Sequence, residues 1–176
     1  MNTALPPLAA LFADPAVTSD RHVFFISEAH VVVGLISGLV TIVAVLLHYE
    51  AMSLLSNYVP RMMLQRRPRI VLVILGMLLL HVIEVWLFAA LFYVLELWPS
   101  LGRLEGPIHE GALDFVYFSV VTYTSLGLGD VVPEGPIRIL AGTETLVGLT
   151  LITWTASFAF LEMQRDWREF RRPPQP

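Results

Sequence analysis

The residues with the clearest chemical potential form one short polar stretch. It reads Thr124, Ser125, Leu126, Gly127, Leu128, Gly129, Asp130. Glycine at alternate positions permits backbone conformations that are closed to other L-residues, so successive carbonyl oxygens can point to one side. A ring of such carbonyls can replace the hydration shell of a cation, which otherwise costs tens of kcal/mol to remove. One chain supplies only one wall of such a ring, so this chemistry requires several chains around an axis.

The composition indicates a membrane protein and excludes several classes of chemistry. The 176 residues are 56% hydrophobic and 15% charged, whereas soluble domains carry about 25% charged residues. A net charge of −4 argues against a nucleic-acid partner. There is no cysteine, which excludes disulfides and thiolate chemistry, and all 11 basic residues are arginine, which excludes Schiff bases. No catalytic grouping or phosphate loop is visible, so we do not expect an enzyme.

The polar stretch must be positioned by apolar helices. About 20 apolar residues are needed to cross a bilayer, and three segments are long enough. We therefore predict an all-α membrane protein. Its expected parts are an extracytoplasmic segment (1–29), a first transmembrane helix (30–49), an Arg-rich connection (50–69), a pore domain (70–162) and a tail (163–176). Within 70–162 we expect an outer helix (70–98), a short re-entrant helix (112–124), the loop 125–129 and an inner helix (136–162).

Charged residues flank these spans unevenly. The connection holds Arg61, Arg66, Arg67 and Arg69, and the tail holds Arg165, Arg168, Arg171 and Arg172. Residues 96–134, on the other side, contain six acids and one arginine. Since arginine is enriched in cytoplasmic segments, we predict a multi-pass protein of the plasma (inner) membrane. Its N-terminus is expected outside and its C-terminus in the cytoplasm.

The stretch T-S-L-G-L-G-D resembles the T-T-V-G-Y-G-D selectivity filter of potassium channels. Tyr117, Phe118, Ser119 and Pro133 also occur where a bacterial two-helix potassium-channel pore would have them. The resemblance covers about half of the chain and leaves the first helix as an addition. It implies a homotetramer embedded in membrane lipids, without a cofactor. Potassium would pass as the permeant ion, bound at Ser125, Leu126, Gly127 and Leu128; below, residues 125–129 are called the filter loop.

The sequence departs from the family pattern at four positions, of which Leu126 in place of valine is conservative in volume. Ser125 replaces threonine but keeps the hydroxyl of the innermost ion site. Leu128 replaces tyrosine, so the hydrogen bond that braces the filter is lost while the carbonyl remains. Val121 stands where some relatives carry a glutamate that pairs with the filter aspartate, so Asp130 needs another partner or stays solvated. The alternatives to a potassium channel are therefore a non-selective cation channel and a non-conducting channel-like subunit.

The inner helix is expected to line the pathway. Gly148 is either the bend of the inner helix or a site of close helix packing. In the family's register Leu149, Ile152 and Ala156 face a cavity, with a constriction near Phe160.

Three ionisable residues inside the predicted spans are candidates for modulation of the pore. Glu144 is expected behind the filter, either as a brace through Thr122 or Tyr123 or as a protonated structural residue. His81 and Glu84 lie three positions apart and share a helix face. As two ligands they fall short of the four that zinc requires, so we favour a buried pair that joins the outer helix to the first span, with a proton-sensing gate as the alternative.

Overall fold

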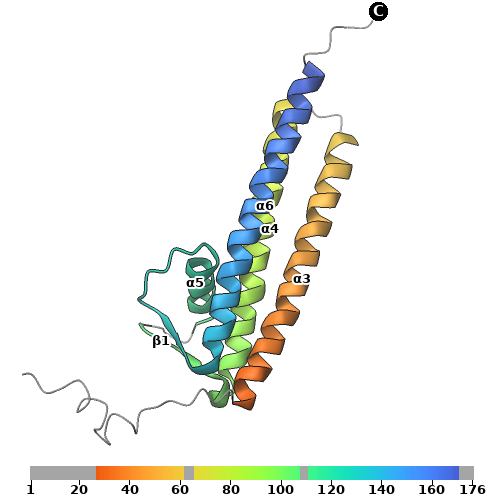
Figure 1. The fold of residues 1–176 in the computed structure, drawn as a ribbon. Coiled ribbons are helices and arrows are strands. Elements are labelled where there is room, and N and C mark those ends of the chain that lie inside the picture. The colour runs from red at the N-terminus through yellow and green to blue at the C-terminus, as the bar shows by residue number, and fades with distance from the viewer. Residues whose placement is uncertain (1–26, 62–65, 108–110, 171–176) are drawn as a thin grey trace, which may run out of the picture.

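The computed structural model describes residues 27–61, 66–107 and 111–170. Three long helices lie side by side: α3 (Glu28–Tyr58), α4 (Arg66–Glu96) and α6 (Arg138–Phe170). The short helix α5 (Ala112–Tyr123) packs against α4 and α6 at one end of this bundle (Figure 1). All three long helices are apolar enough to cross a membrane, over Glu28–Tyr58, Pro68–Glu96 and Gly135–Arg165. The chain is therefore an all-α membrane protein.

All three long helices extend into segments that the sequence analysis left outside them, α4 by beginning at Arg66 and not at residue 70. Helix α3 continues to Tyr58 and into the 3-10 turn η1 (Val59–Arg61), so part of the expected connection is helical. Helix α6 continues to Phe170, beyond the predicted end at residue 162. Neither of these last two extensions contains a glycine or proline before Pro60 and Pro173, and polar residues extend a helix as readily as apolar ones do. The predictions for residues 1–26 and 171–176 fall outside the described residues.

A two-stranded ribbon closes the end of the molecule that holds α5. The 3-10 turn η2 (Pro99–Leu101) leads from α4 into β1 (Arg103–Glu105). Strand β1 pairs antiparallel with β2 (Val132–Glu134), with Leu104 opposite Pro133. The 3-10 turn η3 (Gly135–Ile137) then leads into α6. The ribbon thus ties together the two ends of the loop that contains α5 and the filter loop.

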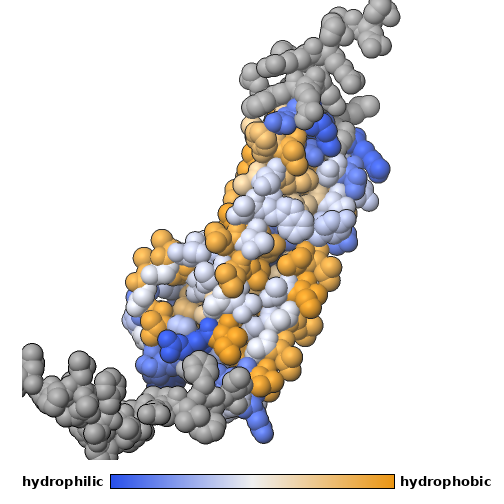
Figure 2. Space-filling view, viewed as in Figure 1, coloured by the Kyte–Doolittle hydropathy of each residue, from blue (hydrophilic) through white to orange (hydrophobic). Residues whose placement is uncertain are grey.

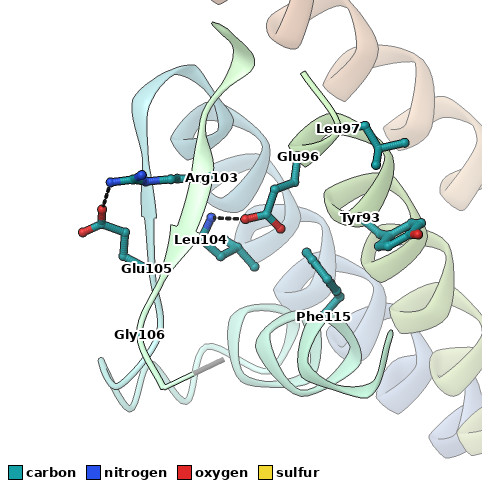
Figure 3. A pocket seen from close by; sticks show the side chains of 8 residues that line it. All are labelled: Tyr93, Glu96, Leu97, Arg103, Leu104, Glu105, Gly106 and Phe115. Atoms are coloured by element: carbon teal, nitrogen blue, oxygen red, sulfur yellow. Dashed lines mark hydrogen bonds and ion pairs between the residues drawn. The ribbon is translucent and has the colours of Figure 1, made fainter. Parts of the chain in front are cut away.

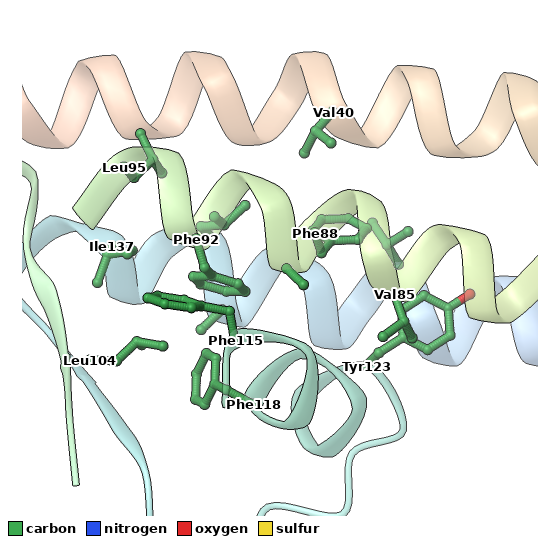
Figure 4. Packing of buried hydrophobic residues seen from close by; sticks show 14 of the residues in the cluster. Val40, Val85, Phe88, Phe92, Leu95, Leu104, Phe115, Phe118, Tyr123 and Ile137 are labelled. Carbon is green, nitrogen blue, oxygen red and sulfur yellow. The ribbon is translucent and has the colours of Figure 1, made fainter. Parts of the chain in front are cut away.

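Aromatic side chains fill the space between α4 and α5 (Figure 4). The rings of Phe92 and Phe118 meet edge to face with their centroids 4.9 Å apart. Tyr93 and Phe115 meet in the same way at 5.4 Å. Such edge-to-face pairs add about 0.5–1.5 kcal/mol each to the burial of their area. These contacts fix the position of α5 against α4, and with it the point at which the following loop begins.

Helix α3 contacts the rest of the protein along a narrow stripe. Its buried residues recur every three or four positions: Val33, Ser37, Val40, Ala44, His48 and Met52. The opposite side carries large exposed apolar residues, including Leu35, Leu39 and Leu46. Figure 2 shows apolar side chains covering much of the bundle, with hydrophilic ones toward its two ends. Small and polar residues facing inward with large apolar ones outward is the pattern of a helix packed within a bilayer.

Candidate functional site

The filter loop follows directly from the C-terminal end of α5. The amides of Leu126 and Gly127 both donate to the carbonyl oxygen of Val121, at 2.9 and 3.3 Å. The amide of Ser125 donates to the carbonyl of Thr122 at 3.0 Å. The last carbonyls of a helix have no partners within the helix, and here the loop that follows supplies them. The N–H groups at the start of the loop are therefore turned toward α5.

The backbone of the filter loop alternates between two conformations. The φ angles of Ser125, Gly127 and Gly129 are +59°, +56° and +78°, whereas Leu126 and Leu128 do not have positive φ. Ser125 is the only non-glycine residue with positive φ in the described part of the chain, and this conformation costs an L-residue about 1–2 kcal/mol. A Cβ added to Gly127 or Gly129 would meet no atom within 4 Å. Glycine is therefore required there by conformation and not by space.

The carbonyls of the filter loop accept no backbone hydrogen bond from the described part of the chain. Residues 124–130 are all exposed. A row of free carbonyls in the membrane-facing part of a protein is tolerated only where it lines a water-filled path or meets further protein. The filter loop is thus built to face a polar pathway or other copies of itself.

Asp130 has the partner that the sequence analysis left open. The Tyr117 hydroxyl donates to its Oδ2 atom at 2.6 Å, and its Oδ1 accepts the Val131 amide at 3.0 Å. The hydrogen bond from Tyr117 lowers the pKa of the Asp130 carboxyl below its ordinary value. Tyr117 in α5 is therefore the partner of Asp130, a role that Val121 cannot perform because its side chain has no polar group. This contact joins the outer end of the loop to the short helix that precedes it.

The residues predicted to line a cavity share one open face of α6. Leu149, Ile152, Ala156 and Phe160 are all exposed in the single chain and follow one another at helical spacing. Gly148 lies beside them but faces inward. A Cβ at this position would come within 2.1 Å of the Tyr123 carbonyl oxygen. Of the two roles considered for Gly148, the structure favours close packing of α6 against the end of α5.

Residues 80–165 match a family model described as "Ion channel". This segment is an ion-channel pore domain. The match begins within α4 and ends within α6, so it includes the re-entrant helix and the filter loop and leaves α3 outside. Comparison of the chain with curated proteins and with solved structures gives no match. The family is one of channels and not of enzymes, and it supports a multi-pass membrane protein that passes cations.

Glu144 lies fully buried behind the re-entrant helix of the pore domain. Its Oε1 atom contacts the hydroxyl of Ser119, and that hydroxyl also donates to the Val85 carbonyl at 2.9 Å. The partner is therefore Ser119 and not Thr122 or Tyr123, because Glu144 meets α5 one turn nearer its N-terminus than expected. Thr122 receives a hydrogen bond from the neighbouring Thr145 instead, at 3.3 Å. Glu144 thus joins α6 to α5 and, through Ser119, to α4.

Five polar side chains from all four helices of the described bundle meet below the filter loop, and we call them the polar cluster. Its members are His48, His81, Glu84, Tyr123 and Thr155. Glu84 is at the centre: its Oε1 atom is 2.8 Å from His48 Nδ1, and its Oε2 atom accepts the Tyr123 hydroxyl at 2.5 Å. His81 Nδ1 lies 3.1 Å from Glu84 Oε2 and 2.9 Å from the Tyr123 oxygen.

The same cluster reaches the inner helix. Thr155 Oγ1 is 3.2 Å from His48 Nε2 and 3.0 Å from His81 Nε2. The buried pair predicted for His81 and Glu84 does join α4 to α3, and the residue that completes it is His48. The sequence analysis missed His48 and Thr155. The signal for His48 was its place in the stripe of small and polar residues on α3, one turn after Ala44.

A cavity of about 750 Å³ lies at the outer end, away from the polar cluster. Its lining comes from α4, β1 and α5 (Figure 3): Tyr93, Glu96, Leu97, Arg103, Leu104, Glu105, Gly106 and Phe115. Its charged side chains already have partners within the chain. Glu96 accepts the Leu104 amide at 3.1 Å, and Arg103 pairs with Glu105. These contacts hold the ribbon to the end of α4, so we assign the residues around this cavity a structural role.

Proposed function

We propose that four copies of the chain surround one axis and conduct potassium ions through their filter loops. The observation that carries the proposal is the alternation of φ at Ser125, Gly127 and Gly129, with the adjoining amides held by Val121. Alternating backbone conformations turn successive carbonyls to one side, and four such walls form the rings that replace the water around a cation. The C-terminal end of α5, which is the negative end of its dipole, adds to the attraction of a cation.

The open face of α6 supports the same arrangement. Leu149, Ile152, Ala156 and Phe160 would line the cavity below the filter, where an apolar wall allows gating by dewetting. The ion sites would be formed by Ser125, Leu126, Gly127 and Leu128. No cofactor is required for this function, and the partners are three further copies of the chain and the surrounding lipid.

We also propose that the filter loop lies near the outer face of the plasma membrane. Arg61, Arg69 and Arg165 lie at the end of the bundle opposite the filter loop (Figure 1). Arginine at that end favours a cytoplasmic location for it. The start of α3 would then be outside and the end of α6 inside.

A non-selective cation channel is the second candidate, and Leu128 is the observation that favours it. Its side chain is 59% exposed in the single chain and has no hydroxyl to fix the loop from behind. A loop without this brace is free to contract around the smaller sodium ion, so it would bind sodium as well as potassium.

Reversal potentials decide between these functions. The purified chain is reconstituted into planar bilayers with potassium on one side and sodium on the other, and its oligomeric state is measured in detergent. A tetramer whose reversal potential lies far from zero, with the sign that potassium flux produces, supports the proposal. A value near zero supports the non-selective channel, and a tetramer without current supports a non-conducting subunit. A monomer or dimer would contradict the shared filter altogether.

A further inference from the structure

Two imidazoles and a carboxylate of the polar cluster converge at a spacing suited to a metal ion. One ligand atom from each of His48, His81 and Glu84 can be chosen so that all lie within 4.8 Å of one another. The two imidazole nitrogens nearest Glu84 are 2.8 and 3.1 Å from its oxygens. Bonds of about 2.0–2.2 Å place the ligand atoms of a tetrahedral zinc ion about 3.3 Å apart. Small side-chain adjustments therefore separate the present geometry from a coordinated one.

The hydrogen bonds of the cluster lack one proton when both histidines are neutral. A neutral imidazole carries a single N–H. If each Nδ1–H donates to Glu84, then both Nε2 atoms face Thr155 as acceptors, at 3.2 and 3.0 Å. The Thr155 hydroxyl has only one proton, so one of these two contacts brings two lone pairs together. Moving the His81 proton to Nε2 removes that clash but leaves His81 Nδ1 facing Glu84 Oε2 at 3.1 Å with no proton between them.

A metal ion bound to both Nδ1 atoms removes this conflict. Each imidazole then carries its proton on Nε2, and both protons point at the Thr155 oxygen, which has two lone pairs to accept them. Metal-bound histidines almost always donate their other N–H in this way, and the acceptor fixes the orientation of the ring. Thr155 is therefore placed as the shared acceptor behind two metal ligands.

We propose that the polar cluster is a binding site for a divalent transition-metal ion of the zinc class. The ligands are His48 Nδ1, His81 Nδ1 and the Glu84 carboxylate, with the Tyr123 hydroxyl beside the fourth position. Two imidazoles and one carboxylate suit zinc, whereas calcium and magnesium require shells of oxygen. The proposal goes beyond conduction and does not depend on it, because metal content is measured on the protein in detergent.

The surroundings of the site favour a bound cation. Glu84 and His48 are fully buried inside membrane-spanning helices, where an uncompensated carboxylate is costly. The His81 side chain is 14% exposed, which leaves a route to the site. The site also joins α3, which lies outside the pore domain, to Tyr123 at the end of α5, two residues before the filter loop.

The first test measures zinc bound to the full chain in detergent. The protein is stripped with a chelator, loaded with Zn²⁺ and freed of excess metal before elemental analysis. We expect one zinc per chain and at least a tenfold loss of affinity in His48→Gln and His81→Gln. The control is His30→Gln, which changes the histidine in the first turn of α3 that pairs with Ser27. Absence of zinc from the wild-type chain would overturn the proposal. The cluster would then be an ion pair between a protonated histidine and Glu84. Equal binding by wild type and His48→Gln would overturn it as well.

The second test does not require that a ligand variant folds. Thr155→Val keeps the shape of the side chain and removes the shared acceptor, whereas Thr155→Ser keeps the hydroxyl. Loss of a hydrogen-bond partner behind a ligand typically costs about 10–100-fold in metal affinity. We expect that loss for Thr155→Val and wild-type affinity for Thr155→Ser. Equal affinities in the two variants would contradict the assignment.

Discussion

The filter loop and the polar cluster lie next to each other in the structure, but they are built in different ways. The filter loop is one continuous segment whose residues are all exposed and whose carbonyls have no backbone partner in the described part of the chain. The polar cluster draws its residues from four helices, and its side chains are paired within a single copy. Only one position separates them, since Tyr123 belongs to the cluster and Ser125 begins the loop.

This difference teaches which part of the function needs assembly. The filter loop is held on one side by α5 and exposed on the other, so the proposed conduction depends on further copies of the chain. The polar cluster is complete in one copy and fixes how α3, α4, α5 and α6 meet. Variants of the two regions should therefore separate conduction from stability of the chain.

The largest effect is expected from Gly127→Ala or Gly129→Ala, which should abolish conduction. Both positions have positive φ, which costs an alanine about 1–2 kcal/mol in each chain. Potassium flux into liposomes is the measurement. Gly142→Ala is a matched control, because Gly142 lies in α6 with nothing within 4 Å of an added Cβ. Unchanged flux in either filter variant would break the assignment of the loop.

Glu84→Gln should chiefly destabilise the chain. The carboxylate lies within hydrogen-bonding distance of His48, His81 and Tyr123 while fully buried. Removing one partner from a buried charged group costs about 3–5 kcal/mol. Thermal unfolding in detergent, followed by helix content, measures this loss. Glu50→Gln, at an exposed position on α3, should change stability by less than about 0.5 kcal/mol. Similar unfolding of the two variants would show that the cluster does not hold the helices together.

Gly148→Ala tests whether α6 packs or bends at this position. An added Cβ would lie 2.1 Å from the Tyr123 carbonyl oxygen, so α6 must move away from α5. Overpacking of this kind costs about 1–3 kcal/mol. We expect a lower unfolding temperature than for Gly38→Ala, where the Cβ meets nothing within 4 Å. Wild-type stability combined with altered opening would favour the bend.

Tyr117→Phe should have the smallest effect, a loss of stability above the ordinary pKa of Asp130 that disappears at strongly acidic pH. The Tyr117 hydroxyl lowers the pKa of Asp130 below the ordinary value of 3.8. The stabilising contribution of this carboxylate is therefore present above its ordinary pKa and lost as the pH falls through the lowered pKa. Without the hydroxyl, the pKa returns toward 3.8, so this contribution is already missing above that pH and the stability of the variant falls less on acidification.

Unfolding temperatures between about pH 5 and about pH 3 measure this shift. Tyr93→Phe is the control, because its ring packs on Phe115 and makes no contact with Asp130. If the stability of both variants falls equally on acidification, Asp130 is solvated, which is the alternative that the sequence analysis gave.

The membrane helices and the pore domain were predictable because their signals are local. Runs of apolar residues predicted the three spans, and the alternating glycines with their flanking residues predicted the re-entrant helix and loop. The family match confirms the resemblance to a channel pore and the all-α membrane fold. Potassium selectivity and the tetramer stay predictions, because they depend on contacts between chains.

The polar cluster was only half predictable because its residues are far apart in the sequence. His81 and Glu84 are one helical turn apart, but His48 lies on another helix and Thr155 on a third. Which helices meet, and at what height, is decided by packing and not by any short spacing. The same reason explains Glu144, whose partner shifted by one turn of α5.

The position of His48 has a consequence for how the protein enters the membrane. An ionised side chain at the centre of a helix adds about 2.5–3.5 kcal/mol to the cost of insertion, and Glu84 lies deep within α4. During synthesis α3 emerges before α4, so its imidazole is already in the bilayer when Glu84 arrives. The first helix thus provides the partner that α4 needs at the moment of its insertion, ahead of the re-entrant helix and α6.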